Sequence, residues 1–358
     1  MKAHALPAAR FPATPALLRQ NSRHFHSPKF LTLSSLTSPP TTTHLKSEID
    51  ANKMEFPDKQ MFILGMGYVG QLFAQQLKNE GWDVAGTCTS VAKKKVLEQK
   101  GFDILVFDAM EPEWKVLDRL RCCTHLLVSV PPTVDIGDPI LQRAETFKAS
   151  LADGNLRWLC YLSTTSIYGD ASGAWVDENY FPKPSNNLAK MRLESEEGWL
   201  KLGQDLGLST YVFRLGGIYG PGRSAIDTIL KKEELSERQK RRANRNFTSR
   251  VHVADICQVL KASISTQIQR KIYNVVDDDP ASRIEVFAFA QQLIQQRWPG
   301  LIDVSDNSII SKLPGGAGKR VSNAHVKKDL GVQLLYPSYR SGLQSIIHNM
   351  EKPILRCG

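Results

Sequence analysis

Three features are missing from the sequence: a long apolar run, cysteines at metal-ligand spacing, and acidic residues before Glu48. It contains no run of eighteen apolar residues, so no membrane-spanning helix is expected. Its six cysteines form no CxxC pair, and none clusters with histidines at metal-ligand spacing, so the sequence gives no sign of a metal site. Finally, the chain has no acidic residue before Glu48, which sets its first segment apart from the rest.

This acid-poor leader, residues 1–55, is rich in serine, threonine and proline. Before Glu48 it carries six Lys or Arg residues and four histidines, but no continuous apolar stretch of the kind that secretory signals need. We expect an organelle transit peptide, with the chloroplast favoured over the mitochondrion because Ser and Thr outnumber Arg. A disordered cytosolic tail is the alternative.

Most of the excess of basic over acidic residues lies before Glu48. The whole chain has 46 Lys+Arg against 36 Asp+Glu, and subtracting the six basic residues before Glu48 leaves 40 against 36. The charged run "KKEELSERQKRRANR" lies within 224–249 and predicts a solvated helix or loop without an apolar face. RNA binding through Lys231–Arg245 is an alternative, but no interleaved aromatics support base stacking, so a nucleic-acid partner is not expected.

From Met61 onward, short apolar runs alternate with helical stretches. "MFILGMG", "WDVAGTCT", "FDILVF", "HLLVSV", "LRWLCYLS" and "STYVFRLG" are each expected to form a strand, with helices between them. Apolar strands that are each followed by a helix predict a doubly wound α/β fold with a parallel sheet. We expect a Rossmann domain over 58–222, to which 250–277 returns. A smaller C-terminal substrate lobe would comprise 223–249 and 278–350, including a glycine-rich loop at Asp306–Asn323.

The glycine motif "GMGYVG" (Gly65–Gly70) follows the first strand and opens the first helix. Gly65 permits a tight turn, Gly67 lets a pyrophosphate approach the backbone, and Gly70 allows close packing of helix on sheet. The helix that begins at Tyr68 and Val69 would present its N–H groups to the phosphates. In this strand–turn–helix setting the motif predicts a dinucleotide site.

The end of the second predicted strand indicates which dinucleotide is bound. NAD sites usually carry an acidic residue about twenty residues past the first glycine, where it holds the ribose 2′-hydroxyl. Here "GTCTS" offers hydroxyls and a thiol instead, and Lys93–Lys95 follow. Thr89, Ser90 and Lys93 could bind a 2′-phosphate, so we predict NADP, with NAD as the alternative.

At this point the sequence resembles a family. "YLSTTSIYGD", "FRLGGIYGPGR", "RVHVADI" and "IYNVVDDDP", after GMGYVG, are similar to motifs of the atypical extended short-chain dehydrogenases/reductases, which include NAD-dependent epimerase/dehydratase-like proteins. The resemblance covers about Gln60–Ile347. It implies a catalytic role for Thr164, an adenine contact for Asp108, and nicotinamide-ribose contacts for Ser129, Val130 and Pro131.

The resemblance also exposes a departure from the family. Lys190 matches the lysine of the family's YxxxK pair, but the tyrosine position is occupied by Asn186. An amide cannot exchange a proton at neutral pH, whereas Lys190 could still hold the ribose hydroxyls. Tyr168 has suitable chemistry for the missing acid/base, although the resemblance gives it an aromatic packing role. His252 is a weaker candidate that is more typical of a structural histidine.

Two functions remain open from the sequence. The first is a plastid oxidoreductase or epimerase/dehydratase that binds NADP and acts on a sugar-like, phosphorylated or nucleotide-linked small molecule. Arginines beside loops suit such a ligand, but each could equally form salt bridges: Arg214, Arg223, Arg250 and Arg320. The second is a non-catalytic NADP(H) sensor or scaffold, which Asn186 favours. A second copy of the chain, as in a homodimer, is a further partner to consider.

Overall fold

The protein's structure, a computed structural model, describes residues 59–108, 115–134, 136–231, 245–266, 271–302 and 316–352. The predicted leader lies outside these residues. So do 232–244, which hold most of the charged run, and 303–315, which hold the first part of the glycine-rich segment.

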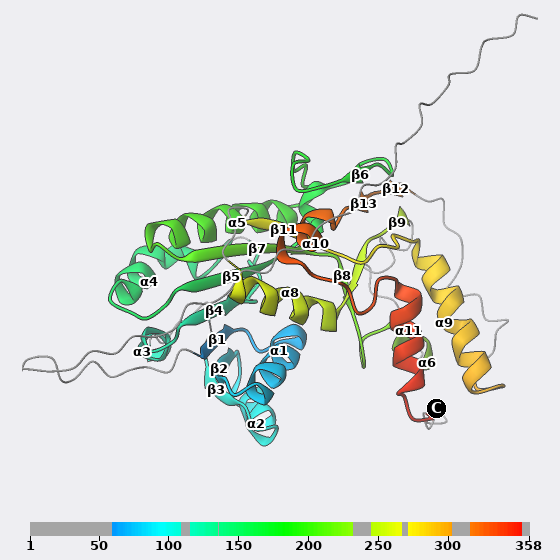
Figure 1. Ribbon diagram of the computed structural model, residues 1–358, viewed down its shortest axis with the longest axis horizontal. Coiled ribbons are helices and arrows are strands. Elements are labelled where there is room, and N and C mark those ends of the chain that lie inside the picture. The colour runs from blue at the N-terminus through cyan, green and yellow to red at the C-terminus, as the bar shows by residue number, and fades with distance from the viewer. Residues whose placement is uncertain are drawn as a thin grey trace, which may run out of the picture. The chain divides into compact units, whose positions relative to one another are not determined.

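A seven-stranded sheet in the order β3-β2-β1-β4-β5-β7-β11 forms the centre of the described chain, and every neighbouring pair of strands is parallel (Figure 1). The strands are β1 (Gln60–Leu64), β2 (Asp83–Cys88), β3 (Asp103–Val106), β4 (His125–Val128), β5 (Trp158–Thr164), β7 (Ser209–Leu215) and β11 (Ile272–Val275). The chain runs outward from β1 to β3 and then reverses at β4, so the switch point lies between β1 and β4.

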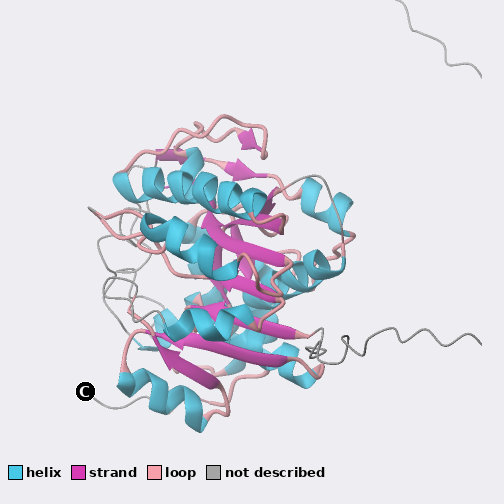
Figure 2. Cartoon of the chain, turned by 90° about the vertical axis from the view of Figure 1, so that its left-hand side faces the viewer, coloured by secondary structure: helices cyan, strands magenta, loops and turns pink. Residues whose placement is uncertain are grey.

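Helices pack on both faces of this sheet, as Figure 2 shows. One buried cluster joins the sheet to α1 (Tyr68–Asn79), α2 (Val91–Gln99), α8 (Val253–Ser265) and α10 (Ala324–Leu330). The other cluster joins it to α3 (Lys115–Arg121), α4 (Ala144–Leu151) and α5 (Asn187–Asp205). The predicted doubly wound α/β fold is therefore confirmed.

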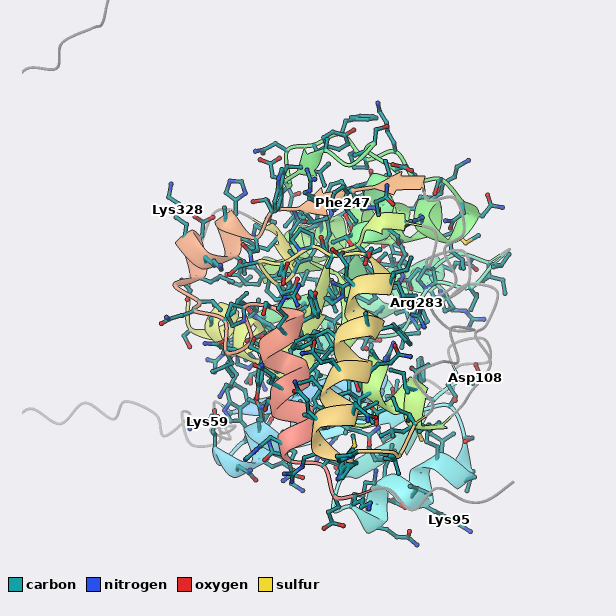
Figure 3. All side chains as sticks on the ribbon, turned by 90° about the vertical axis from the view of Figure 1, so that its right-hand side faces the viewer. Lys59, Lys95, Asp108, Phe247, Arg283 and Lys328 are labelled. Atoms are coloured by element: carbon teal, nitrogen blue, oxygen red, sulfur yellow. The ribbon has the colours of Figure 1, made fainter. Side chains whose placement is uncertain are left out.

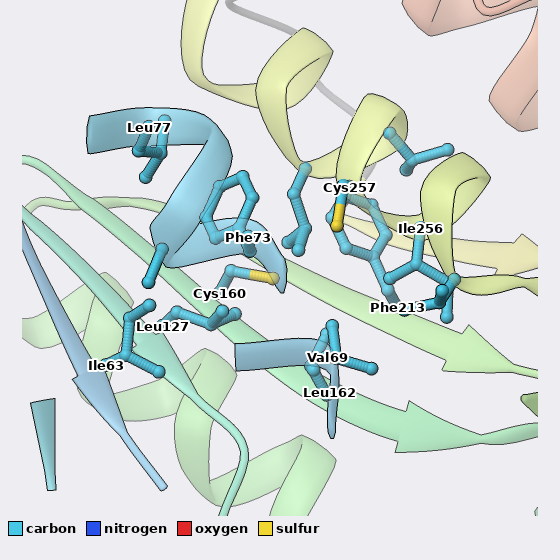
Figure 4. Close-up of a cluster of buried hydrophobic side chains, with 14 of the residues drawn as sticks. Ile63, Val69, Phe73, Leu77, Leu127, Cys160, Leu162, Phe213, Ile256 and Cys257 are labelled. Atoms are coloured by element: carbon cyan, nitrogen blue, oxygen red, sulfur yellow. The ribbon is translucent and has the colours of Figure 1, made fainter. Parts of the chain in front are cut away.

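Side-chain periodicity explains why these helices form where they do. In α1, Val69, Phe73 and Leu77 recur at helical spacing and are buried, and Figure 4 shows them near Ile63 and Cys160 of the sheet. The strands have no polar face because helices cover both sides, which is why their sequences read as continuous apolar runs.

A third buried cluster lies beyond the sheet. Helices α6 (Ala225–Lys231), α9 (Arg283–Arg297) and α11 (Tyr339–His348) form it. The segment 224–249 was expected to have no apolar face, and its first part corrects this. Helix α6, which ends where the charged run begins, buries Ile226 and Ile229 against this cluster.

Three short parallel pairings lie at the ends of the sheet strands. They are β8 (Gly217–Tyr219) with β10 (Arg250–His252), β9 (Arg245–Phe247) with β12 (Gly316–Gly318), and β6 (Trp175–Val176) with β13 (Arg320–Val321). Among the described helices, none is long and apolar enough to cross a bilayer. The same residues contain no cluster of three or more side chains suited to a metal ion.

Candidate active site

The loop between β1 and α1 is shaped by its three glycines. Gly65 has a φ of +95°, and a Cβ on it would come within 3.3 Å of the backbone of Ser129. A Cβ at Gly70 would lie 3.0 Å from the Gly65 carbonyl oxygen, so glycine is what lets α1 approach the strand. At Gly67, that same oxygen is the nearest atom, 4.0 Å away. The space beside Gly67 therefore suits a phosphate group that approaches the backbone.

Helix α1 begins at this space. Gly67 is its N-cap, no side chain caps it, and its first turn has no acidic residue. The N–H groups of Tyr68, Val69 and Gly70 lie in the first turn, where the helix leaves its N–H groups without intrahelical partners. The fixed partial positive charge at this end favours a pyrophosphate. A dinucleotide thus fits the residues that the sequence predicted for it.

The ends of β2 and β3 lie beside each other next to this loop. Cys88 pairs with Val106, which brings exposed Thr89 and Ser90 near exposed Asp108 at one edge of the sheet. The Ser90 hydroxyl accepts a hydrogen bond from the backbone N–H of Lys93 at 3.3 Å and so caps α2. The Lys93 side chain is exposed, and 88–90 carry no carboxylate that would repel a phosphate.

The next strand end closes the loop from the other side. The backbone N–H of Ser129 donates to the Leu64 carbonyl at 2.8 Å, and Val130 contacts the position that a side chain on Gly65 would fill. Pro131 follows and is exposed. Residues 129–131 therefore lie at the switch point between β1 and β4, where open α/β sheets bind ligands.

Thr164 is the last residue of β5 and begins the 3-10 helix η2 (Thr165–Tyr168). Its hydroxyl lies 3.0 Å from the Ser166 hydroxyl and accepts the Ser166 backbone N–H at 3.2 Å. Thr164, Thr165 and Ser166 line a small cavity of about 80 Å³. The structure therefore gives Thr164 access to a ligand at the end of the sheet.

Asn186 has a clear local role at the start of α5. Its Oδ1 accepts the backbone N–H of Ala189 at 3.0 Å, which makes Asn186 the N-cap. Asparagine is among the best N-cap residues because its short amide reaches the unsatisfied N–H groups of the first turn. Lys190 lies one turn further along, and its side chain is exposed. The helix itself packs on β5 and η2.

Tyr168 does not reach this site, which corrects its prediction as a catalytic residue. The side chain is fully buried, and its hydroxyl donates to Asn274 Oδ1 at 2.8 Å while it accepts from Arg214 Nη1 at 2.9 Å. Burial raises the pKa of Tyr168 to about 12, although the charge of Arg214 opposes the shift. The phenol is thus held as a structural donor and cannot serve as an acid/base for a ligand.

Arg214 is likewise structural rather than a ligand-binding arginine. It forms a bidentate ion pair with Glu196, with Nη2 to Oε2 at 2.7 Å and Nε to Oε1 at 3.2 Å. Both side chains are buried, and the Ser163 hydroxyl also hydrogen-bonds to Glu196. His252 is also structural, since its Nδ1 accepts the Ala254 N–H to cap α8, and burial lowers its pKa to about 4.

A larger cavity of about 370 Å³ lies between β8, α6, β10, α9 and α11. Its charged lining comprises Arg223, Asp227, Lys231, Arg250 and Arg283, so cations outnumber acids. Figure 3 shows Arg283 at the start of α9. The volume suits a small-molecule ligand, and the charge suits an anionic one.

The walls of this cavity hold buried polar atoms that have no hydrogen-bond partner among the described residues. Nη1 of Arg250 and the hydroxyl of Tyr339 are examples, and the Arg250 guanidinium lies over the Tyr339 ring at 5.3 Å. Behind Arg250, Asp277 is buried as well, and burial raises its pKa to about 8 against the opposing charge of Arg250. Buried polar groups are normally satisfied, so a ligand that accepts hydrogen bonds would complete this wall.

The glycine loop and the large cavity are in contact. The Tyr68 hydroxyl donates to the Pro221 carbonyl at 3.0 Å, and the Arg223 guanidinium lies 5.4 Å from the centre of the Tyr68 ring. The large cavity also shares Gly217, Thr248 and Ser249 with the small cavity at Thr164. The glycine loop, Thr164 and the large cationic cavity therefore form one connected region.

Comparisons with known proteins agree with this architecture. Protein YeeZ of Escherichia coli (strain K12) is 26% identical over 287 residues, which are 78% of this chain and 97% of YeeZ. A conserved protein of unknown function from Silicibacter pomeroyi DSS is 32% identical, with a TM-score of 0.64 over 82% of this chain and 100% of that one. The chain belongs to the family of the Silicibacter protein. No protein-family model matches it.

The fold is that of the NAD-dependent epimerase/dehydratase-like extended short-chain dehydrogenases/reductases. UDP-glucuronic acid 4-epimerase from Bacillus cereus, solved with NAD and a fluorinated UDP-glucuronic acid, has a TM-score of 0.63 over 81% of this chain and 99% of its own, at 16% identity. The predicted resemblance to this group is confirmed.

The structure also shows residues of the candidate site that sequence reasoning missed. Lys319, Arg283 and Tyr339 line the cavities, and Asp277 lies behind Arg250. Of these residues, only Lys319 had a signal in the sequence, because it lies in a glycine-rich segment that predicted a loop. Arg283, Tyr339 and Asp277 lie on helices or at strand ends whose sequences read as ordinary structural segments.

Proposed function

We propose that the protein is an NADP-binding oxidoreductase or epimerase/dehydratase that acts on a sugar-like substrate carrying a phosphate or a nucleotide. The observation that carries this proposal is the connected region in which the glycine loop, Thr164 and the cationic cavity meet. The coenzyme would supply hydride transfer at the Thr164 end. The substrate's anionic part would lie in the cavity with the unsatisfied Nη1 of Arg250.

The preference for NADP rests on the strand-end residues Thr89, Ser90 and Lys93. Two hydroxyls and an exposed ammonium at the end of β2 suit a 2′-phosphate, and the absence of a carboxylate at 88–90 removes the usual partner of a free 2′-hydroxyl. The Bacillus cereus epimerase is described with NAD, so this coenzyme choice is where the protein would differ from it.

Calorimetry with the four coenzymes tests the first half of the proposal. We expect NADPH and NADP⁺ to bind at least tenfold more tightly than NADH and NAD⁺. The change Lys93→Glu should remove that preference while leaving NADH affinity nearly unchanged, and Lys201→Glu on the exposed face of α5 is the matched control. Absence of binding heat with all four coenzymes would refute it.

Mass spectrometry of the ligand that copurifies with the protein tests the second half. A phosphorylated or nucleotide-linked sugar is the expected result. Turnover of that ligand should disappear in Thr164→Ala, with NADPH affinity nearly intact, because the Thr164 hydroxyl is expected to touch the substrate and not the phosphates of the coenzyme. Full turnover in Thr164→Ala would contradict this assignment.

A non-catalytic NADP(H) sensor is the second candidate, and Asn186 favours it. The residue caps a helix and has no proton to exchange, and the nearby Tyr168 phenol is fully buried. A sensor should bind its partner with different affinity in the NADP⁺ and NADPH states and turn over no metabolite. RNA binding through Lys231–Arg245 would instead give a steep salt dependence of RNA affinity.

Plastid import belongs to the same proposal and rests on the composition of the leader alone. Incubation of the full chain with isolated chloroplasts should yield a shortened, protease-protected product. The same chain without residues 1–55 should stay outside. Equal import of both forms would contradict the assignment.

A further inference from the structure

We propose that Lys319 is the proton-transfer residue of this site and replaces the tyrosine whose position Asn186 occupies. The inference rests on the proposed function, because a hydride transfer at carbon requires a matching proton transfer at oxygen. Asn186 cannot carry that proton, and the phenol of Tyr168 is fully buried in a structural network.

Lys319 lines the small cavity at Thr164. Among the described residues that line this cavity, Arg245 and Lys319 are the basic ones, and none carries a carboxylate, imidazole, phenol or thiol. A guanidinium does not give up its proton in proteins, whereas an ammonium can. Among the residues that line the cavity, Lys319 is therefore the one suited to exchange a proton with a ligand beside Thr164.

The backbone on both sides of Lys319 is fixed, which makes this a built site. Gly318 pairs with Phe247 across β12 and β9. Glycine is required at this position because φ is +73° and because a side chain there would collide with the Phe247 carbonyl oxygen. On the other side, Arg320 pairs with Trp175, and the Val321 N–H donates to Ser249 Oγ at 3.1 Å. Lys319 thus joins two short pairings.

The side chain of Lys319 is directed inward from this segment. It is 7% exposed, and its Nζ donates to the Gly169 carbonyl at 2.5 Å. Gly169 directly follows η2, the short helix that Thr164 caps, so the bond fixes the ammonium against the C-terminal end of that helix. The contact with Gly169 orients the ammonium, which can protonate a ligand because a lysine, unlike an arginine, can give up a proton.

The chemical step balances with these groups. In the reductive direction, the substrate carbonyl carbon accepts a hydride from NADPH, the π bond to oxygen breaks, and the oxygen takes a proton from the Lys319 ammonium. The products are an alcohol, NADP⁺ and a neutral amine, which solvent then reprotonates. The oxidative direction reverses each transfer. Thr164 would donate a hydrogen bond to the same oxygen.

The geometry also sets the size of the substrate. The small cavity shares Gly217, Thr248 and Ser249 with the cavity that holds Arg250. A ligand with its anionic part at Arg250 and its reacting carbon between Thr164 and Lys319 would span that shared wall. A sugar joined to a diphosphate meets this requirement.

The test uses the full chain with NADP⁺ and a panel of UDP-glucose, UDP-glucuronic acid and dTDP-glucose, with NADPH fluorescence and chromatography of the sugar nucleotides as the readouts. We expect Lys319→Met and Lys319→Arg to lower the rate of hydride transfer about a hundredfold or more. Arginine keeps the charge, so its failure separates proton transfer from electrostatics. NADPH affinity should stay within twofold, and Lys201→Met, an exposed change on α5, should alter neither quantity.

A rescue experiment guards against a variant that merely misfolds. Lys319→Cys treated with 2-bromoethylamine regains an amine of nearly the same length, and its rate should recover at least tenfold, with equally treated wild type as the control. UDP-glucuronic acid with NADP⁺ should also protect Lys319 of the wild type from acetylation, as measured by peptide mass spectrometry.

The outcomes separate the two proposals. If wild type turns over and Lys319→Met keeps its rate within tenfold, the role of Lys319 is overturned while the proposed function stands. If Lys319→Arg is as fast as wild type, the residue contributes charge and no proton, which also overturns the inference. A wild type that turns over no member of the panel overturns the proposed function, and the proton role falls with it.

Discussion

Replacing Asp277 by asparagine should change how the stability of the protein depends on pH. Asp277 lies just after β11, is 2% exposed, and has no hydrogen-bond partner for either carboxylate oxygen among the described residues. Its backbone N–H donates to the Arg250 carbonyl at 2.6 Å. Burial raises its pKa to about 8, the charge of Arg250 lowers it, and Asp279 raises it.

The sign follows from proton binding in the two states. An unfolded aspartate has a pKa of about 3.9, so between about pH 4 and pH 8 the folded protein holds a proton at Asp277 that the unfolded chain has released. The stabilisation is complete below the unfolded pKa and is lost as pH rises through the folded one. Its largest slope is a loss of about 1.4 kcal/mol per pH unit.

Urea unfolding at pH 5, 6, 7 and 8, followed by tryptophan fluorescence, measures this slope. Asparagine is neutral at every pH, so Asp277→Asn should gain up to about 4 kcal/mol relative to wild type between pH 5 and pH 8. Other titrating groups, such as Asp255, are present in both proteins and cancel in the difference. Asp153→Asn, at an exposed turn, should give a flat difference.

A difference between Asp277→Asn and wild type that does not change with pH would refute this reasoning. It would mean that Asp277 stays ionised throughout and forms an ion pair with Arg250. A difference that falls as pH rises would show that ionised Asp277 stabilises the fold. In either case Arg250 would be less available to a phosphate than the unpaired Nη1 suggests.

Three further changes test other parts of the site. Gly65→Ala should weaken NADPH binding at least tenfold in calorimetry, because the φ of +95° and the close backbone of Ser129 exclude a Cβ at this position. The control is Gly207→Ala, which is also at positive φ but is open to solvent, and it should lower the melting temperature without changing NADPH affinity. Arg250→Met should weaken UDP binding tenfold or more and leave NADPH affinity within twofold, since it lines the cavity apart from the glycine loop. Glu196→Gln should lower the free energy of unfolding by about 3–5 kcal/mol in urea, because it leaves the buried Arg214 charge unpaired; an unchanged midpoint would contradict the ion pair's role.

The sequence predicted the sheet and the glycine loop because both depend on local signals. A strand covered on both faces must be continuously apolar, and the turn into α1 needs glycine wherever a Cβ would collide. The strands began and ended within a few residues of the predicted ranges, as for "HLLVSV", which forms β4 over His125–Val128. These features can be read from neighbouring residues alone.

The substrate side of the site could not be read in this way. Lys319 lines the same cavity as Thr164 because β12 pairs with β9 and β13 with β6. Segments of two or three residues carry no periodicity that would predict such pairings. Tyr168 was misassigned because the partners of its hydroxyl, Arg214 and Asn274, come from β7 and β11. Long-range contacts decide both cases.

Asn186 illustrates why a lost motif residue does not by itself decide function. The amide caps α5 through Ala189, so the residue is explained by the need to start a helix, whether or not the protein is an enzyme. The argument for catalysis must then rest on another group that can exchange a proton beside Thr164. Lys319 is held there by Gly169 and lines the same cavity, so the contrast between Lys319→Arg and wild type, rather than any change at Asn186, separates an enzyme from a sensor.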